Sequence, residues 1–123
     1  MKVFNADGSV LMEVTSLERN GKSLEFNGMV MGAMHTRLES LDHAIERQAA
    51  FYAERARGQA GLIVTGGFAP NLDGRLDEEG PTLMTDEEAD ELKPITAAVH
   101  AEGGKILLQV LHTGRSALIA QPV

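Results

Sequence analysis

Cysteine and tryptophan are absent from this 123-residue chain, and aromatic residues make up only 4% of it. The lack of cysteine excludes disulfides, thiolate zinc sites, cysteine-ligated iron–sulfur clusters and a cysteine nucleophile within these residues. The apolar runs are far shorter than the roughly 20 residues that a membrane-spanning helix needs. The first residues also lack the apolar segment of a secretory signal. We therefore expect a cytoplasmic protein with no membrane partner.

Basic residues are scarce as well, with 11 Lys and Arg against 18 Asp and Glu, so the formal charge is −7. An acidic chain without a basic stripe does not release counterions from a phosphate backbone, which argues against a nucleic-acid partner. The four histidines show no spacing typical of metal ligands, so no metal site is predicted. The hydrophobic content of 43% is that of an ordinary folded domain.

Three short apolar runs alternate with two amphipathic stretches along most of the chain. The amphipathic stretches, at about residues 44–57 and 85–102, repeat apolar side chains at helical spacing. The apolar runs predict strands covered on both faces, and they are Met29–Met34, Leu62–Thr65 and Lys105–Leu111. This alternation predicts an α/β fold built of parallel βαβ units with right-handed crossovers.

The residues before this region predict a β-hairpin. Val10–Val14 and Ser23–Phe26 flank the pair Asn20-Gly21, which favours a tight turn. The residues between Val14 and Asn20 leave the strand register open.

Several residues predict where the helices begin and end. Either Ser40 or Asp42 is expected to cap the first helix, and Gly58 is expected to end it with a left-handed residue. Thr85 and Glu88 have the spacing of a capping box for the next helix, and Pro94 predicts a break within it. The segment 68–83 has no periodicity and predicts a long surface loop, a type of segment that often carries function.

Polar or small residues follow the predicted strands, where parallel α/β folds gather their chemistry. Gln109 stands among aliphatic residues, and its amide either bonds to neighbouring backbone or faces a heteroaromatic ligand. Gly67 either makes a plain turn or allows a ligand close to the backbone. His35 and His112 both follow strands and are candidates to line one pocket. The residues alone leave these alternatives open.

Four segments together resemble the old yellow enzyme family of FMN-dependent reductases, most closely its NADH:flavin oxidoreductase and 2,4-dienoyl-CoA reductase branch. The resemblance extends from about Asn27 to Arg115, and its segments are Met31–Thr36, Glu46–Arg57, Leu62–Gly67 and Ala98–Arg115.

The resemblance implies a fold. The family has a TIM (β/α)₈ barrel, which typically needs about 250 residues. This chain would supply its N-terminal portion, about three βα units preceded by a β-hairpin. Residues 1–28 would form the hairpin at the barrel floor, and residues 29–123 a partial FMN-binding barrel.

The resemblance also implies site residues. Ala33, Met34 and His35 would lie against the FMN ring system, Gly67 would allow the ring close to the second strand, and Gln109 would hydrogen-bond its pyrimidine portion. His112 and Arg115 would contact substrate or brace the pocket.

In such enzymes NAD(P)H reduces FMN, and the reduced flavin passes hydride to an activated C=C bond, in enoates or dienoyl-CoA esters. The segments that carry the family's proton-donating tyrosine, its substrate-binding His/Asn pair and its iron–sulfur cysteines have no counterpart here. The only tyrosine, Tyr52, falls on a predicted helix. We therefore expect a fragment without catalytic residues, inactive by itself, whose parent takes a small-molecule substrate. The alternative is a non-catalytic α/β module that self-assembles, or complements another barrel fragment, through exposed sheet edges.

Overall fold

The computed structural model describes residues 2–4, 10–13, 15–20 and 23–118, and describes side chains from residue 28 onward. Two antiparallel strand pairs come first, and a parallel three-stranded sheet with three α-helices follows. The strands are β1 (Lys2–Phe4), β2 (Val10–Glu13), β3 (Thr15–Asn20), β4 (Ser23–Gly28), β5 (Val30–Met31), β6 (Leu62–Phe68) and β7 (Lys105–Val110). The helices are α1 (Ala44–Arg57), α2 (Asp86–Glu91) and α3 (Lys93–Ala101), with short 3₁₀ turns at Leu38–Ser40, Leu72–Gly74 and Gly114–Ser116.

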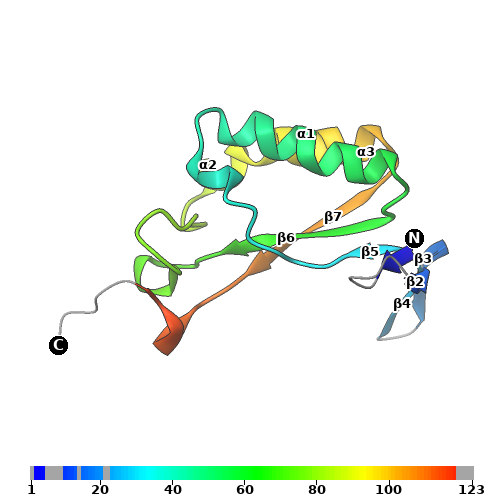
Figure 1. The fold of residues 1–123 in the computed structure, drawn as a ribbon, viewed down its shortest axis with the longest axis horizontal. Coiled ribbons are helices and arrows are strands. Elements are labelled where there is room, and N and C mark those ends of the chain that lie inside the picture. Colours follow the sequence, from blue (N-terminus) through cyan, green and yellow to red (C-terminus); the bar gives the residue numbers. More distant parts are fainter. Residues whose placement is uncertain (1, 5–9, 14, 21–22, 119–123) are drawn as a thin grey trace.

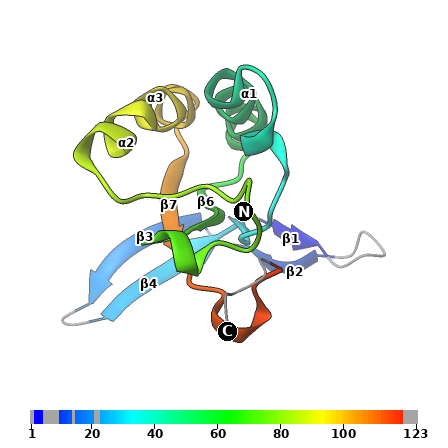
Figure 2. The ribbon, with the colours of Figure 1, turned by 90° about the vertical axis from the view of Figure 1, so that its left-hand side faces the viewer.

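The parallel sheet has the strand order β5-β6-β7, so each crossover joins neighbouring strands through helices. Both ribbon views place α1 and α3 on the same side of this sheet (Figures 1 and 2). The antiparallel pairs lie at the end of the sheet where β6 and β7 begin (Figure 1), and β1 contacts β5. The loops that follow the three parallel strands therefore meet at the opposite end.

The core lies between the sheet and the helices. Ile63 of β6 and Val99 of α3 are fully buried, and Tyr52 of α1 is 2% exposed. Ile106 of β7 packs against the same cluster. Because side chains alternate along a strand, Ile63 and Ile106 turn toward the helices and their neighbours turn to the other face.

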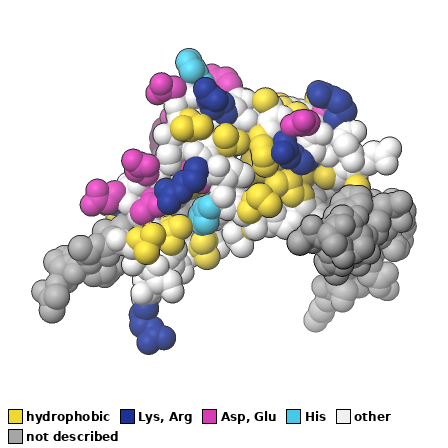
Figure 3. Space-filling model, viewed as in Figure 1, with side chains coloured by type: hydrophobic (Ala, Val, Ile, Leu, Met, Phe, Trp, Pro, Cys, Tyr) yellow, Lys and Arg dark blue, Asp and Glu magenta, His cyan; other side chains and the backbone are white. Residues whose placement is uncertain are grey.

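The other face is bare at β7, where Leu107 is 49% exposed. Val110, at the end of the strand on the helix side, is 63% exposed, so the prediction of a strand covered on both faces is wrong for β7. Among the described residues no strand pairs with the outer edge of β7, and the helices cover only one side. Figure 3 also shows hydrophobic side chains exposed in the middle of the molecule, where helices and sheet meet.

The N-terminal hairpin differs from the prediction. The partner of β4 is β3, in a register that pairs Asn20 with Ser23, and β2 pairs with β1 instead. The expected turn at Asn20-Gly21 is consistent with that register, although Gly21 lies outside the described residues. Residues 15–20, which the prediction left between the strands, thus form a strand themselves.

The predicted start of the first helix is wrong, and its end at Gly58 is predicted correctly in position but not in conformation. Neither Ser40 nor Asp42 caps α1, because residues 38–40 turn into a 3₁₀ segment and His43 takes the N-cap position at φ 57°. At the other end Gly58 has φ −74°, and the left-handed residue is Gln59, at φ 71°.

The predicted start of α2 and the break near Pro94 are both confirmed. Thr85 Oγ1 accepts a hydrogen bond from the Glu88 amide at 3.2 Å, and the Glu88 carboxylate accepts one from the Thr85 amide at 3.2 Å. The helix then stops at Glu91, and Pro94 lies in the first turn of α3, where its missing N–H costs nothing. Within the described residues, no helix has both the length and the apolar character to cross a membrane.

The capping box gives a stability prediction. Thr85→Ala should lower the free energy of unfolding by about 1 kcal/mol at neutral pH, measured by urea denaturation, because the Glu88 amide loses its acceptor. Hydrogen bonds from the Met84 amide, the Thr82 hydroxyl and the Thr85 amide lower the pKa of Glu88. The contribution of Glu88 is therefore present at neutral pH and is lost as the pH falls through its folded-state pKa. Thr96→Ala, an exposed threonine of α3 outside any cap, is the control, and an equal loss there would contradict the assignment.

Candidate functional site

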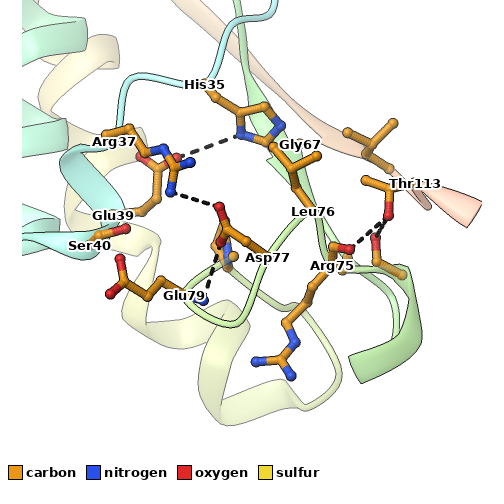
Figure 4. A pocket seen from close by; sticks show the side chains of 15 residues that line it. His35, Arg37, Glu39, Ser40, Gly67, Arg75, Leu76, Asp77, Glu79 and Thr113 are labelled. Atoms are coloured by element: carbon orange, nitrogen blue, oxygen red, sulfur yellow. Dashed lines mark hydrogen bonds and ion pairs between the residues drawn. The ribbon is translucent and has the colours of Figure 1, made fainter. Parts of the chain in front are cut away.

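A cleft opens at the carboxyl edge of the parallel sheet, between the loops that follow β5, β6 and β7. Because the strands are parallel, these three loops converge at one edge, as they do in other α/β folds. Figure 4 shows the side chains that face the cleft. Its lining includes His35 and Arg37 after β5, Asp77 and Glu79 after β6, and Thr113 after β7.

Polar contacts hold the three loops together. Arg37 Nη1 lies 2.7 Å from Asp77 Oδ2, an ion pair that joins the loop after β5 to the loop after β6. The Thr113 hydroxyl lies 2.7 Å from the Arg75 carbonyl oxygen and joins the loop after β7 to the same segment. His35 Nδ1 lies 3.7 Å from Glu39 Oε1 (Figure 4).

The cleft itself is small. Its volume of ≈ 20 Å³ holds about one water molecule. A tricyclic ring therefore does not fit between the loops as they stand. In the described part of the chain, no group of three or more histidine or acidic side chains is arranged to hold a metal ion.

A β-bulge shapes the strand ends. The parallel pairing of β6 with β7 runs regularly to Val64 opposite Leu107, shifts, and resumes with Gly67 opposite Gln109. Gly67 is buried, and a methyl group added to it would lie 2.5 Å from the Leu111 side chain. The bulge thus sets Gly67 and Gln109 side by side at the carboxyl edge.

Gln109 projects from the bare face of the sheet. Leu108 lines a cavity on the helix side, so the alternation along β7 puts Leu107 and Gln109 on the opposite face. Gln109 is half-buried, and no described residue forms a hydrogen bond with its side-chain amide. Its backbone amide instead donates to Thr65 Oγ1 at 3.1 Å.

The segment after β5 lies against the bulge. A methyl group added at Gly66 would lie 2.8 Å from the Met34 carbonyl oxygen and 3.6 Å from His35 Cα, so the two backbones are in close contact. Ala33 precedes this contact and is exposed, and Met34 is 54% exposed. The structure therefore brings four of the five predicted cofactor residues into one contiguous strip, in the order Met34, His35, Gly67 and Gln109, with Ala33 beside it.

His112 and Arg115 lie apart from this strip. Both line a wider cleft of ≈ 520 Å³ with Asp73, Gly114 and Ala117. His112 Nδ1 accepts a hydrogen bond from the Gly114 amide at 3.1 Å, and its ring lies against Gly74. His35 and His112, predicted to line one pocket, line neighbouring clefts, and His112 contacts Gly74, which lines the cleft of His35.

Two residues with side chains on the helix side of the sheet were not predicted as part of the site. Thr65 is buried, and its hydroxyl contacts both Gly66 and Gln109. Tyr52 Oη accepts a hydrogen bond from the Gly66 amide at 3.3 Å. Helical periodicity predicts Tyr52 correctly as a core residue, but nothing in the sequence signals that its hydroxyl reaches a strand.

Comparison with known proteins decides the family. A model of the NADH:flavin oxidoreductase / NADH oxidase family matches residues 21–122. The chain belongs to this family. The predicted resemblance to the old yellow enzymes is therefore confirmed.

Individual members of the NADH:flavin oxidoreductase family show how much of such an enzyme the chain represents. An NADPH dehydrogenase of Bacillus velezensis is 37% identical over 68 residues, which cover 55% of this chain and 20% of that protein. Among solved structures, an old yellow enzyme from Pichia sp. AKU4542 aligns with a TM-score of 0.67 and 26% identity, over 87% of this chain and 28% of its own. A 2-naphthoyl-CoA reductase in complex with 2-naphthoyl-CoA aligns with a TM-score of 0.67 and 26% identity. The alignment covers 85% of this chain and 16% of the reductase chain.

The predicted fold class, the N-terminal part of a TIM (β/α)₈ barrel, is confirmed by these structural likenesses. The chain spans between about a sixth and a little over a quarter of the solved structures named here.

Proposed function

We propose that the chain is the FMN-binding part of an NAD(P)H-dependent oxidoreductase that reduces activated C=C bonds. One observation carries the proposal: the bulge in β6 sets Gly67 opposite Gln109, whose side-chain amide has no hydrogen-bond partner among the described residues. An amide that both donates and accepts matches the pyrimidine edge of a flavin. Membership in a flavin oxidoreductase family supports the same assignment.

The residues present fit a flavin ring at the carboxyl edge. Gly67 carries no side chain at the carboxyl edge and packs closely against Leu111, and the exposed Met34 offers a flat ring a polarisable apolar contact beside it. Ala33 and His35 would flank the ring, and Gln109 would fix its orientation. When bound, the flavin supplies hydride transfer, and this chain orients it and excludes water from one side.

The chain by itself is not expected to catalyse the reaction. Its only tyrosine, Tyr52, is buried in the core, and its hydroxyl is engaged with the Gly66 amide. It therefore cannot protonate a substrate at the strand ends. His112 and Arg115 line the wider cleft next to the strip and are proposed to contact substrate or brace the pocket.

We extend the proposal to the substrate and to the two segments of the chain. A small molecule with an activated alkene, carried as an acyl-CoA ester in the branch that the sequence resembles, would approach from the bare face of the sheet. Residues 1–28 would close the barrel floor, because β1–β4 lie where β6 and β7 begin (Figure 1), and residues 29–123 would carry the cofactor.

The proposal is tested by titrating FMN into the chain and following the quenching of flavin fluorescence. Saturable binding is expected, and Gln109→Ala should weaken it by about tenfold, because hydrogen bonds to the pyrimidine edge are lost in a poorly solvated site.

Leu107→Ala is the matched control, since Leu107 lies on the same face of the same strand but nearer its beginning. The Kd of the Leu107→Ala variant for FMN should stay within about twofold of that of the unmodified chain, a change well below 1 kcal/mol. Absence of saturable binding in the unmodified chain, or equal losses in both variants, would overturn the proposal.

A further inference from the structure

We infer that Tyr52 and Thr65 are positioning residues, which act from the helix side of the sheet to hold the β6 bulge and thereby place Gly67 and Gln109 against the flavin. The inference deepens the proposed function and rests on it. Neither residue projects from the bare face where the ring would lie. Their effect on the cofactor therefore passes through the backbone of β6 and β7.

The bulge is an insertion of one residue. Val64 pairs with Leu107 and Gly67 with Gln109, so Thr65 and Gly66 together stand opposite the single residue Leu108. Regular pairing from Val64 onward would bring Gly66, not Gly67, opposite Gln109. A slip of one residue exchanges the faces of a strand. The position of Gly67 beside the Gln109 amide therefore depends on the bulge.

Thr65 replaces the ladder bonds that the extra residue removes. Its Oγ1 accepts a hydrogen bond from the Gln109 backbone amide at 3.1 Å and donates one to the Gly66 carbonyl oxygen at 2.8 Å. The residue is 6% exposed, so water does not compete readily for these bonds. One hydroxyl thus ties the inserted residue of β6 to the residue of β7 that carries the proposed ligand contact.

Tyr52 holds the other side of the inserted residue. Its Oη accepts a hydrogen bond from the Gly66 amide at 3.3 Å, and its ring packs in the core cluster with Ile63 and Val99. The ring also contacts Phe51 edge-on, with centroids 5.2 Å apart. Because the ring is fixed in the core, its hydroxyl is a fixed anchor for the bulge, and burial raises the pKa of Tyr52 and keeps it neutral.

The same anchor places the segment after β5. The close contact between Gly66 and the Met34 carbonyl oxygen means that a shift of Gly66 moves Met34 and His35 as well. Two hydroxyls in the core thus control the relative positions of all three strand ends. Gly66 therefore connects the core of the domain to the segments proposed to contact the flavin.

The test compares Thr65→Val, which removes the hydroxyl and keeps the shape, with Thr65→Ser, which keeps the hydroxyl. Thr96→Val makes the same change as Thr65→Val at an exposed position on α3. Two quantities are measured on the full chain: hydrogen exchange of the Gly66 and Gln109 amides without ligand, and the Kd for FMN. In Thr65→Val we expect the Gln109 amide to exchange about tenfold faster and FMN to bind about fivefold more weakly. Thr65→Ser and Thr96→Val should match the unmodified chain in both.

Tyr52→Phe should accelerate exchange at Gly66 and weaken FMN binding about threefold, since a neutral hydrogen bond to one amide is lost. A double-mutant cycle separates positioning from general stability. In a Gln109→Ala chain, Thr65→Val should cost less affinity than in the unmodified chain, because one of the groups it positions is already gone.

Unchanged exchange at Gln109 in Thr65→Val would overturn the inference, and so would fully additive losses in the cycle. If Thr65→Val does not fold, Tyr52→Phe and Thr65→Ser decide by the same two readouts. Failure of the unmodified chain to bind FMN would overturn the proposed function instead. The exchange rates without ligand would then decide alone whether the two hydroxyls hold the bulge.

Discussion

Replacing Val99 with alanine is expected to lower the free energy of unfolding by about 2–3 kcal/mol, whereas Val110→Ala should lower it by less than about 0.5 kcal/mol. Both variants remove the same two methyl groups. Val99 is fully buried between α1, α3 and the sheet, so its loss leaves a cavity, while Val110 is 63% exposed on β7. Urea denaturation followed by circular dichroism measures both. A loss of this size is a large share of the 5–15 kcal/mol typical of a domain.

The pair also tests the alternative function, a module that self-assembles or complements another barrel fragment through its sheet. Val110 and Leu107 are both exposed, on opposite faces of β7, which is the outer strand of the parallel sheet. If a second polypeptide covered this edge of the sheet in solution, Val110→Ala would cost nearly as much as Val99→Ala, and its cost would depend on protein concentration. A small, concentration-independent cost is the result expected for an uncovered edge.

The helix side of the fold is predictable from sequence because local rules and burial agree there. Apolar periodicity identifies Tyr52 and Val99, and the spacing of Thr85 and Glu88 identifies the start of α2. Pro94 marks the boundary before α3 because a missing N–H is tolerated only in a first turn. Each of these signals depends on residues within one or two turns of each other.

Features set by distant parts of the chain are less predictable. The apolar run of β7 is that of a strand covered on both sides, yet burial depends on which neighbours are present, and here one face is bare. The N-cap of α1 is His43 in a left-handed conformation, where Ser40 and Asp42 are the better cap formers. The 3₁₀ turn that precedes α1 decides that outcome, and it has no clear sequence signal.

In the candidate site, too, some residues can be predicted from local sequence and others depend on distant parts of the chain. Gln109 and Gly67 can be identified because a lone amide and a glycine at strand ends contrast with their apolar surroundings. That they pair with each other depends on the one-residue bulge in β6, which no spacing in the sequence indicates. Thr65 and Tyr52 have the ordinary appearance of a strand residue and a core residue. Their hydrogen bonds to the bulge become visible only once helix and sheet are packed.

The largest effect on cofactor binding is expected at Gly67. Gly67→Ala places a methyl group 2.5 Å from Cβ and Cδ2 of Leu111. Gly67 also lines the edge of the sheet where the flavin would approach. Overpacking of this kind typically costs 1–3 kcal/mol, and loss of close approach to the ring adds to it. We expect FMN affinity to fall by more than about tenfold, measured by fluorescence titration beside a urea unfolding curve. Gly61→Ala is the control, since an added methyl group there meets its nearest atom, the Met29 carbonyl oxygen, only at 4.0 Å.

A second substitution shows whether the glycine serves the flavin or only the packing of Leu111. The double variant Gly67→Ala/Leu111→Ala removes the side chain that the new methyl group would strike. If the glycine exists for the ligand, the double variant regains stability relative to Gly67→Ala but still binds FMN weakly, because the methyl group stands between the ring and β6. Recovery of FMN affinity together with stability would contradict a direct role. Gly67 would then matter only through Leu111, and the flavin would have to approach the sheet through Gln109 and the segment after β5.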